Sequence, residues 1–241
     1  MHVKSARHSQ SKADVTVTQW EALPQFLSME QLFAIRSCNV SPGRRLLLDL
    51  MTRVGLRSVE ARTFALKYVF NPYRRKDCAP DRMIRIRLDP RDMMTKFNKP
   101  RDVDIPFSLM NDLHAYTLHE RNRLANEGEE CSALILTTGG RKFTKDGIGE
   151  VCASISKRVG FKFNALMLRH SYAVHTLRRL RQDPNFHGEP LLYLRDRMGH
   201  SSVQTTTIYL RQIEQLAGGL ALAVEDEFDA MFQRQLDSEK N

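Results

Sequence analysis

The chain has 241 residues, of which 41% are hydrophobic and 27% are charged, a mixture typical of a globular protein with a buried core. No apolar run reaches the roughly 18 residues that a membrane-spanning helix needs, and the polar N-terminus lacks the apolar region of a secretory signal. The formal net charge of +9 favours a polyanionic partner such as nucleic acid, because bound Lys and Arg release its counterions. A merely solvated basic surface is the alternative.

The spacing of cysteines and histidines argues against a metal site. The four cysteines form no close pair, which supports neither a zinc site nor a disulfide framework and suggests a reducing cytoplasm. Two histidine pairs, one of them His170 and His175, are spaced five residues apart, so their members would point about 140° apart on a helix. We therefore expect no bound metal.

Three helices are expected first along the chain. Ser28 and Gln31 fit a capping box at the start of one helix. The Ser41-Pro42 pair predicts the start of a second helix, which should end at Gly55. A short third helix is expected after Leu56.

Alternation of apolar and polar residues then predicts strands. Residues 83–88 alternate isoleucine and leucine with Arg85 and Arg87, the period of a half-buried strand. Met93–Phe97 and Val103–Ile105 are expected to continue a small antiparallel sheet, with a turn at residues 98–100. We interpret the open arginine face as a ribbon that faces DNA; the alternative is a charged side that faces solvent.

The second half of the chain is predicted to be mainly helical. Ser108 should cap a long amphipathic helix that ends before Gly128, and residues 133–136 are a candidate edge strand. Further helices are expected over residues 144–159, 166–181, 191–197 and 202–210, followed by an apolar helix over residues 213–233.

Three short motifs are weak when each is taken alone. Gly55-Leu56-Arg57 is followed by Glu60, and an ordinary pair of Arg57 with Glu60 in a helix would explain it. Lys96 lies in a lysine-rich turn, which is commonplace. Arg169, in Leu168-Arg169-His170, lies on an apolar helix and would need a partner if buried.

A fourth motif, residues 198–209, gives the other three their meaning. Gly199-His200 is followed by Ser201, then Thr205-Thr206, and then Tyr209 nine residues after the histidine. This run resembles the motif that delivers the nucleophile in tyrosine recombinases, the phage integrase family. The three weaker motifs precede it in the order that this family shows.

The resemblance covers residues 23–215 and implies an α+β fold: a mainly helical catalytic domain with a small antiparallel sheet. Residues 1–22 would form a flexible tail. Residues 216–241 would form a C-terminal helix and tail, which in relatives often docks on a neighbouring protomer. Family members usually carry a separate N-terminal DNA-binding domain, so the chain is expected to be either a fragment or a naturally short member.

The resemblance also implies a reaction without metal or nucleotide cofactor. Tyr209 would attack a DNA phosphorus and form a 3′-phosphotyrosyl ester, which conserves the energy of the phosphodiester bond. Arg57 and Arg169 would grip the phosphate, because planar guanidinium groups bind it bidentately and stay charged. Lys96 would protonate the leaving 5′-oxygen, and His200 would donate a hydrogen bond to the phosphate. Glu60 would brace the site near Arg57.

Two points in this assignment stay open. Tyr172 is the nearest competing nucleophile, although we interpret it as a core aromatic with a tethered hydroxyl. The family usually has histidine three residues before the second arginine, where this chain has Leu166. The enzyme could work without that group and use water as the base, His170 could compensate from the same helix face, or the protein could be a weakened enzyme that mainly binds DNA.

The leading hypothesis is a site-specific recombinase or integrase of a mobile element. It would act in the cytoplasm on double-stranded DNA, as a tetramer on two DNA sites. Type IB topoisomerases use the same chemistry, but the run from Gly199 to Tyr209 favours recombinases. A DNA-binding protein on the same fold, catalytically weakened or inactive, is the alternative.

Overall fold

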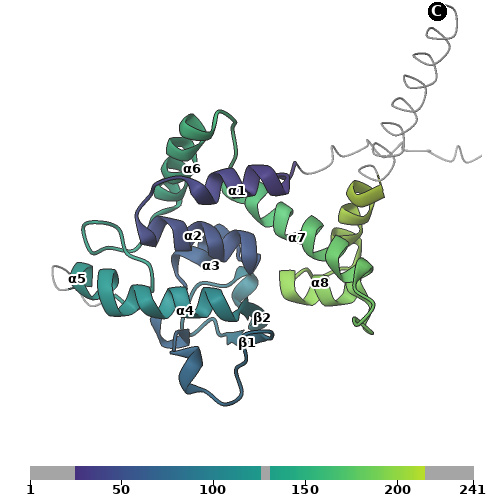
Figure 1. Cartoon of the computed structure of the whole chain (residues 1–241), viewed down its shortest axis with the longest axis horizontal. Helices are drawn as coiled ribbons and strands as arrows, with labels where there is room; N and C mark the ends of the chain where they lie inside the picture. Colours follow the sequence, from purple (N-terminus) through teal and green to yellow (C-terminus); the bar gives the residue numbers. More distant parts are fainter. Residues whose placement is uncertain (1–24, 126–130, 215–241) are drawn as a thin grey trace, which may run out of the picture.

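The computed structural model describes residues 25–125 and 131–214, which form a mainly helical domain with a two-stranded antiparallel sheet (Figure 1). This confirms the predicted α+β fold. The α-helices are α1 (Met29–Ser37), α2 (Pro42–Arg53), α3 (Ser58–Arg62), α4 (Phe107–Tyr116), α5 (Asn122–Ala125), α6 (Lys145–Val159), α7 (Ala165–Gln182), α8 (Pro190–Met198) and an unlabelled helix over residues 204–214. The strands are β1 (Met83–Leu88) and β2 (Arg101–Pro106); short 3-10 turns cover Leu66–Tyr68, Pro72–Arg74 and Lys96–Asn98, and a π-helical turn covers Thr117–Arg121.

The N-terminal helices begin and end where their sequence signals predict. The hydroxyl of Ser28 accepts a hydrogen bond from the Gln31 amide (3.2 Å), and the Gln31 side chain accepts one from the Ser28 amide (3.0 Å). Pro42 opens α2 at its first turn. Gly55 follows with a φ of +72°, and a Cβ there would lie 2.3 Å from the ring of Tyr172. The glycine therefore permits both the turn and the close approach of α7.

The sheet has two strands, so one of the three predicted segments is wrong. β1 and β2 pair directly, with Arg85 opposite Asp104 and Arg87 opposite Asp102. Met93–Phe97, predicted as a strand, instead belongs to the connecting loop and runs into a 3-10 turn. Its apolar residues do not keep to one face as a strand would require: Met93 is buried, whereas Phe97, which alternation would place on the same face, is exposed. The arginines of β1 form ion pairs across the ribbon, at 3.1 Å and 3.4 Å.

Two further boundaries differ from the expectation. α4 begins at Phe107, and the hydroxyl of Ser108 accepts a hydrogen bond from Arg53 (2.7 Å) instead of capping the helix. Residues 133–136 do not add an edge to the sheet but make isolated bridges, Ala65 with Ala133 and Leu136 with Lys142. Loop packing against α3 and α4 therefore replaces the expected strand.

The remaining helices confirm the prediction. Thr144 caps α6 and Gly160 ends it at a φ of +81°; α7 ends just before Asp183, and α8 ends at Gly199. The predicted tail over residues 1–22 lies outside the described residues, and so does nearly all of the predicted helix over residues 213–233.

The apolar core has two parts that meet along α7. Leu168 belongs to the larger cluster, which gathers α1 to α4, α6 and both strands. Tyr172, Leu177, Met198 and Tyr209 belong to a smaller cluster with α8 and the helix over residues 204–214. Since α7 packs against both α2 and α8, residues in its first turns lie at the junction of the two clusters (Figure 1).

Candidate active site

All five residues that the sequence assigned to the chemistry line one cavity of about 530 Å³. Each comes from a different segment: the N-cap of α3, the loop between the strands, α7, the loop after α8, and the last described helix. The five residues are Arg57, Lys96, Arg169, His200 and Tyr209, and Leu166 and His170 line the same cavity. The fold thus brings together residues that lie up to 152 positions apart in the sequence.

One wall of the cavity is an arginine cluster, which we define as Arg57, Glu60, Arg101 and Arg169. The fully buried Glu60 accepts hydrogen bonds from the backbone amide of Arg57 (2.8 Å) and from its guanidinium (3.2 Å). Arg101 donates to both oxygens of Glu60, at 2.6 Å and 3.4 Å. Burial acts to raise the pKa of Glu60, but Arg101 and Arg169 outweigh it and hold that pKa below its usual range. Glu60 braces the site as expected; Arg101 was missed.

Backbone carbonyls fix the outer edges of this cluster. Arg57 donates to the carbonyl of Gly199 (3.1 Å), and Arg101 donates to the carbonyl of Arg197. Arg169 spans the carbonyls of Gly55 and Met198. Three of these four acceptors are carbonyls at the C-terminal end of α8, where the helix dipole favours positive charge. The end of α8 therefore orients the guanidinium groups before any ligand arrives.

The cluster carries more positive than negative charge. Burial, together with Arg57 and Arg101, lowers the pKa of Arg169 to about 9. Burial also lowers the pKa of Arg57. Within the cluster Glu60 supplies one negative charge for three guanidinium groups. A bound anion would relieve this imbalance, so the wall suits a phosphate group.

The tyrosine of the fourth motif faces this wall. Tyr209 is only 2% exposed, and its hydroxyl lies 2.8 Å from Nδ1 of His170. Burial raises the pKa of Tyr209, whereas Arg169 and Arg57 act to lower it. Burial and the neighbouring Arg169 lower the pKa of His170 to about 4. A protonated phenol therefore meets a neutral imidazole at neutral pH.

Comparison with known proteins gives related sequences, although no protein-family model matches the chain. Tyrosine recombinase XerC of Herpetosiphon aurantiacus is 30% identical over 115 residues, which are 47% of this chain and 35% of that protein. Transposase A from transposon Tn554 of Staphylococcus aureus is 24% identical over 210 residues, which are 85% of this chain and 53% of that protein. The chain thus spans about a third of the XerC protein that it matches.

Solved structures give the fold. The XerH recombinase bound to its difH substrate aligns with a TM-score of 0.62 and 23% identity, over 85% of this chain and 54% of that one. The XerA recombinase aligns with a TM-score of 0.60 and 20% identity, over 81% of this chain and 66% of that one. The described residues of this chain therefore have the fold of the recombinase catalytic domain.

The other two polar residues of the pocket at Tyr209 differ in how firmly they are held. His200 is bonded through Nδ1 to the hydroxyl of Thr206 (2.9 Å), and its ring lies nearly parallel to that of Tyr209. Burial, followed by Arg169 and three other cations, lowers the pKa of His200 to about 3, so the ring is neutral. Lys96 is exposed, and its ammonium lies 4.7 Å from the centre of the Phe97 ring.

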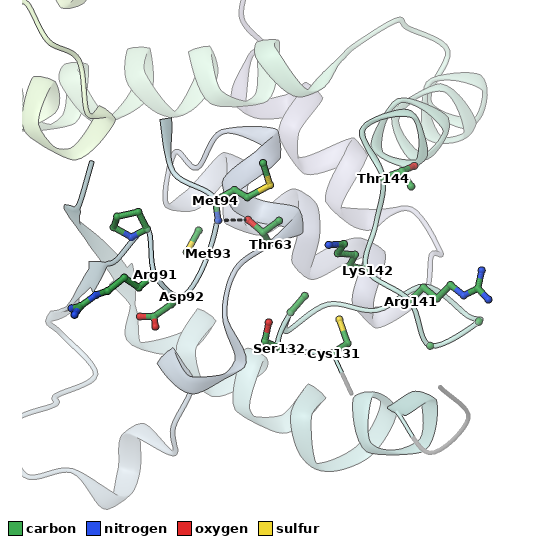
Figure 2. Close-up of a pocket in the computed structure, with 14 residues that line it drawn as sticks. Thr63, Arg91, Asp92, Met93, Met94, Cys131, Ser132, Arg141, Lys142 and Thr144 are labelled. Atoms are coloured by element: carbon green, nitrogen blue, oxygen red, sulfur yellow. Dashed lines mark hydrogen bonds between the residues drawn. The ribbon is translucent and has the colours of Figure 1, made fainter. Parts of the chain in front are cut away.

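The loop that carries Lys96 is anchored a few residues earlier. The amide of Met94 donates to the hydroxyl of Thr63 at 3.1 Å, as Figure 2 shows. Asp92 accepts hydrogen bonds from Lys67 (2.6 Å) and from the hydroxyl of Tyr68 (2.7 Å). These contacts hold the base of the loop and leave the exposed lysine able to move toward a ligand.

Figure 2 shows a second, larger cavity of about 980 Å³ behind this loop. Arg91, Arg141 and Lys142 are among its lining residues, but none of the five predicted site residues is. Arg91 is paired with Asp89 at 2.6 Å. Among the described residues, no histidine or tyrosine lines this cavity. The candidate site is therefore the pocket at Tyr209.

The structure places Tyr172 and Leu166, the two residues whose roles the sequence left open. Tyr172 is buried against Gly55, with its hydroxyl bonded to Thr176, which confirms the interpretation as a core aromatic. Leu166 lines the pocket at Tyr209, is 61% exposed and lies one helical turn before His170. His170, which the sequence offered only as one of three ways around Leu166, is the residue in contact with the Tyr209 hydroxyl.

Within residues 25–125 and 131–214, no group of three or more His, Cys, Asp or Glu side chains lies in an arrangement that could hold a metal ion. No helix in these two ranges combines the length and the apolar character needed to cross a membrane.

Proposed function

We propose that this protein is a site-specific recombinase or integrase that cleaves and rejoins DNA through a 3′-phosphotyrosyl intermediate on Tyr209. The observation that carries the proposal is the meeting of the Tyr209 hydroxyl with a buried and a half-buried guanidinium group, an imidazole and a lysine in one cavity. Matches to XerC and to a transposase support the same activity, although the chain spans only part of either protein.

The first step transfers a phosphoryl group from a DNA oxygen to the phenol. Oη of Tyr209 attacks the scissile phosphorus, the bond from phosphorus to the 5′-oxygen breaks, and a 3′-phosphotyrosyl ester forms. The guanidinium groups of Arg57 and Arg169 stabilise the charge that builds on the non-bridging oxygens, because they are oriented beforehand by backbone carbonyls. Nδ1 of His200 is occupied by Thr206, so Nε2 would donate to the phosphate.

The leaving 5′-oxygen needs a proton, which we assign to Lys96. The flexible lysine lines the cavity from an exposed loop, whereas the arginines are fixed in its wall. Attack by a second 5′-hydroxyl on the phosphotyrosyl ester reverses the step and rejoins the strand. A general acid in this position contributes about 10²–10⁴ to the rate.

Double-stranded DNA is the proposed partner. XerH was solved with its difH substrate and the Tn1549 transposon integrase with a circular intermediate DNA, and this chain shares their fold. The net charge of +9 agrees with such a partner. We further propose self-association into a tetramer on two DNA sites, exchange of the segment over residues 216–241 between protomers, and action in the cytoplasm.

Covalent trapping on nicked duplexes tests the activity. The substrate is a pool of duplexes with a randomised interior and a nick near the centre. Cleavage close to the nick releases a short strand, which diffuses away, so the phosphotyrosyl adduct cannot be rejoined. Adducts that survive denaturation are expected with the natural protein and none with Tyr209→Phe, which should bind DNA equally well because only a hydroxyl is removed. Binding by the natural protein without any adduct would support the DNA-binding module that the leucine at position 166 suggested.

A further inference from the structure

We propose that His170 is the general base that takes the proton from Tyr209. The inference rests on the proposed function and adds to it the destination of the phenolic proton. The contact is direct, since 2.8 Å separates Nδ1 of His170 from Oη of Tyr209 in a buried part of the pocket. This distance lies within the range over which a positioned base accepts a proton.

The protonation states agree with this role. His170 is neutral at physiological pH, so Nδ1 has a free lone pair when the proton of the ring sits on Nε2. The charged and titratable groups facing the pair are Arg57, Lys96, Arg169 and His200. Burial and the neighbouring Arg169 weaken the basicity of the imidazole while the pocket holds no anion. A phosphodiester adds negative charge, so the imidazole becomes a stronger base once DNA is bound.

The other candidates in the pocket are less suited to this proton. Leu166 has no acceptor atom. His200 uses Nδ1 for the hydroxyl of Thr206 and stacks its ring on that of Tyr209, with 20° between the planes. His170, by contrast, contacts the hydroxyl of Tyr209 through Nδ1.

The step balances within the pocket. The O–H bond of Tyr209 breaks, and its proton binds Nδ1 of His170, giving an imidazolium ion. The freed electron pair on Oη forms the bond to phosphorus, and the bond from phosphorus to the 5′-oxygen breaks. Lys96 supplies the proton for that oxygen. Rejoining runs the sequence backwards and returns the proton from His170 to Tyr209.

The test compares His170→Asn with His187→Gln and Lys96→Ala in single-turnover cleavage of a nicked duplex recovered from the trapping pool. Asparagine can still hydrogen-bond the phenol but cannot accept its proton, and His187 is an exposed control. We expect His170→Asn to cleave about 10²–10³-fold more slowly and His187→Gln to be unchanged. The residual rate of His170→Asn should rise with pH, because hydroxide then removes the proton.

Two altered reactants separate the base from the acid. A 5′-phosphorothiolate has a sulfur leaving group that needs no proton, so it should restore Lys96→Ala and leave His170→Asn slow. Fluorotyrosine at position 209 ionises more easily and should restore part of the His170→Asn rate alone. The assignment is overturned if His170→Asn cleaves within about threefold of the natural rate, because removal of a general base slows a reaction by about 10²-fold or more. It is also overturned if the sulfur leaving group restores the rate of His170→Asn. Absence of any adduct with the natural protein overturns the proposed function as well.

Discussion

The arginine cluster and the nucleophile segment (residues 199–214) meet in one pocket, but they are held in different ways. Every guanidinium of the cluster is bonded to Glu60, to a backbone carbonyl or to both, and Glu60 itself is completely buried. The nucleophile segment contacts the rest of the protein through the smaller apolar cluster, through the bond of Tyr209 with His170 and through the Gly199 carbonyl, which accepts from Arg57. The bond of His200 with Thr206 lies within the segment. The phosphate grip is therefore set by the main fold, whereas the nucleophile depends on a small peripheral contact surface.

This difference suits a reaction with a reversible covalent step. Electrostatic stabilisation is greatest when the charges need no rearrangement at the moment of reaction. A nucleophile that becomes linked to DNA must instead change its contacts during each cycle. In the proposed reaction Oη of Tyr209 leaves His170 when it bonds to phosphorus, and a segment held mainly by apolar contacts costs less to rearrange than a cluster of buried ion pairs would.

The largest expected effect comes from the residue that joins the two regions. Arg169→Lys keeps one charge but cannot span the carbonyls of Gly55 and Met198 while also gripping a phosphate. Trapping of the nicked duplex should slow by about 10²–10³-fold, the loss typical of one transition-state donor. Arg179→Lys, on the exposed side of the same helix, is the control. Equal rates for both variants would mean that the grip does not depend on this geometry.

Removal of the central carboxylate should damage stability before it damages chemistry. Glu60→Gln leaves Arg57 and Arg101 without their counter-charge in a buried place, and breaking such a pair costs about 3–5 kcal/mol. Urea unfolding measures the loss. Asp77→Asn, which removes an exposed pair with Arg75, should leave the unfolding curve nearly unchanged. If the two variants unfold alike, the cluster is not a rigid part of the fold.

A smaller effect is expected where the two regions touch. Gly199 has a φ of +59°, and a Cβ there would lie 2.7 Å from Cδ of Arg101. Gly199→Ala should therefore lower the free energy of unfolding by about 1–3 kcal/mol and slow trapping, because Arg101 must shift. Gly149→Ala within α6 has open space around it and should instead stabilise by up to about 1 kcal/mol. The opposite signs of the two changes distinguish strain from helix propensity.

The smallest expected effect is the response to acid of the contact between α7 and the nucleophile segment. The pKa of His170 is lowered to about 4, so the unfolded chain binds a proton more readily than the folded chain. Its contribution to stability is present above the unfolded pKa and is lost as the pH falls from about 6.5 to about 4. Allowing for solvent screening, this loss is about 1 kcal/mol, and His170→Asn should remove it. Urea unfolding at several pH values measures the difference; curves of equal slope would contradict the buried, neutral imidazole.

Most helices of the fold could be predicted from the sequence because the signals that mark helix ends are local. The capping box at Ser28, the proline at Pro42 and the glycine at Gly160 mark helix ends through interactions a few residues long. The strand predicted over Met93–Phe97 was wrong because five residues give too few alternations to identify a strand, and the packing of Met93 in the core decided the conformation of this segment. The start of α4 moved to Phe107 because the Ser108 hydroxyl is used by Arg53 from another helix.

By itself the sequence determined the candidate nucleophile and its four polar companions, since motif order and the spacing of His200 and Tyr209 are properties of one line of residues. Only the tertiary structure decided that Arg101 completes the cluster and that His170, more than Leu166, faces the phenol. Helical spacing placed residues 166 and 170 on the same face and could not choose between them. The choice depends on where a helix 39 residues later in the chain packs against α7, which is a long-range contact.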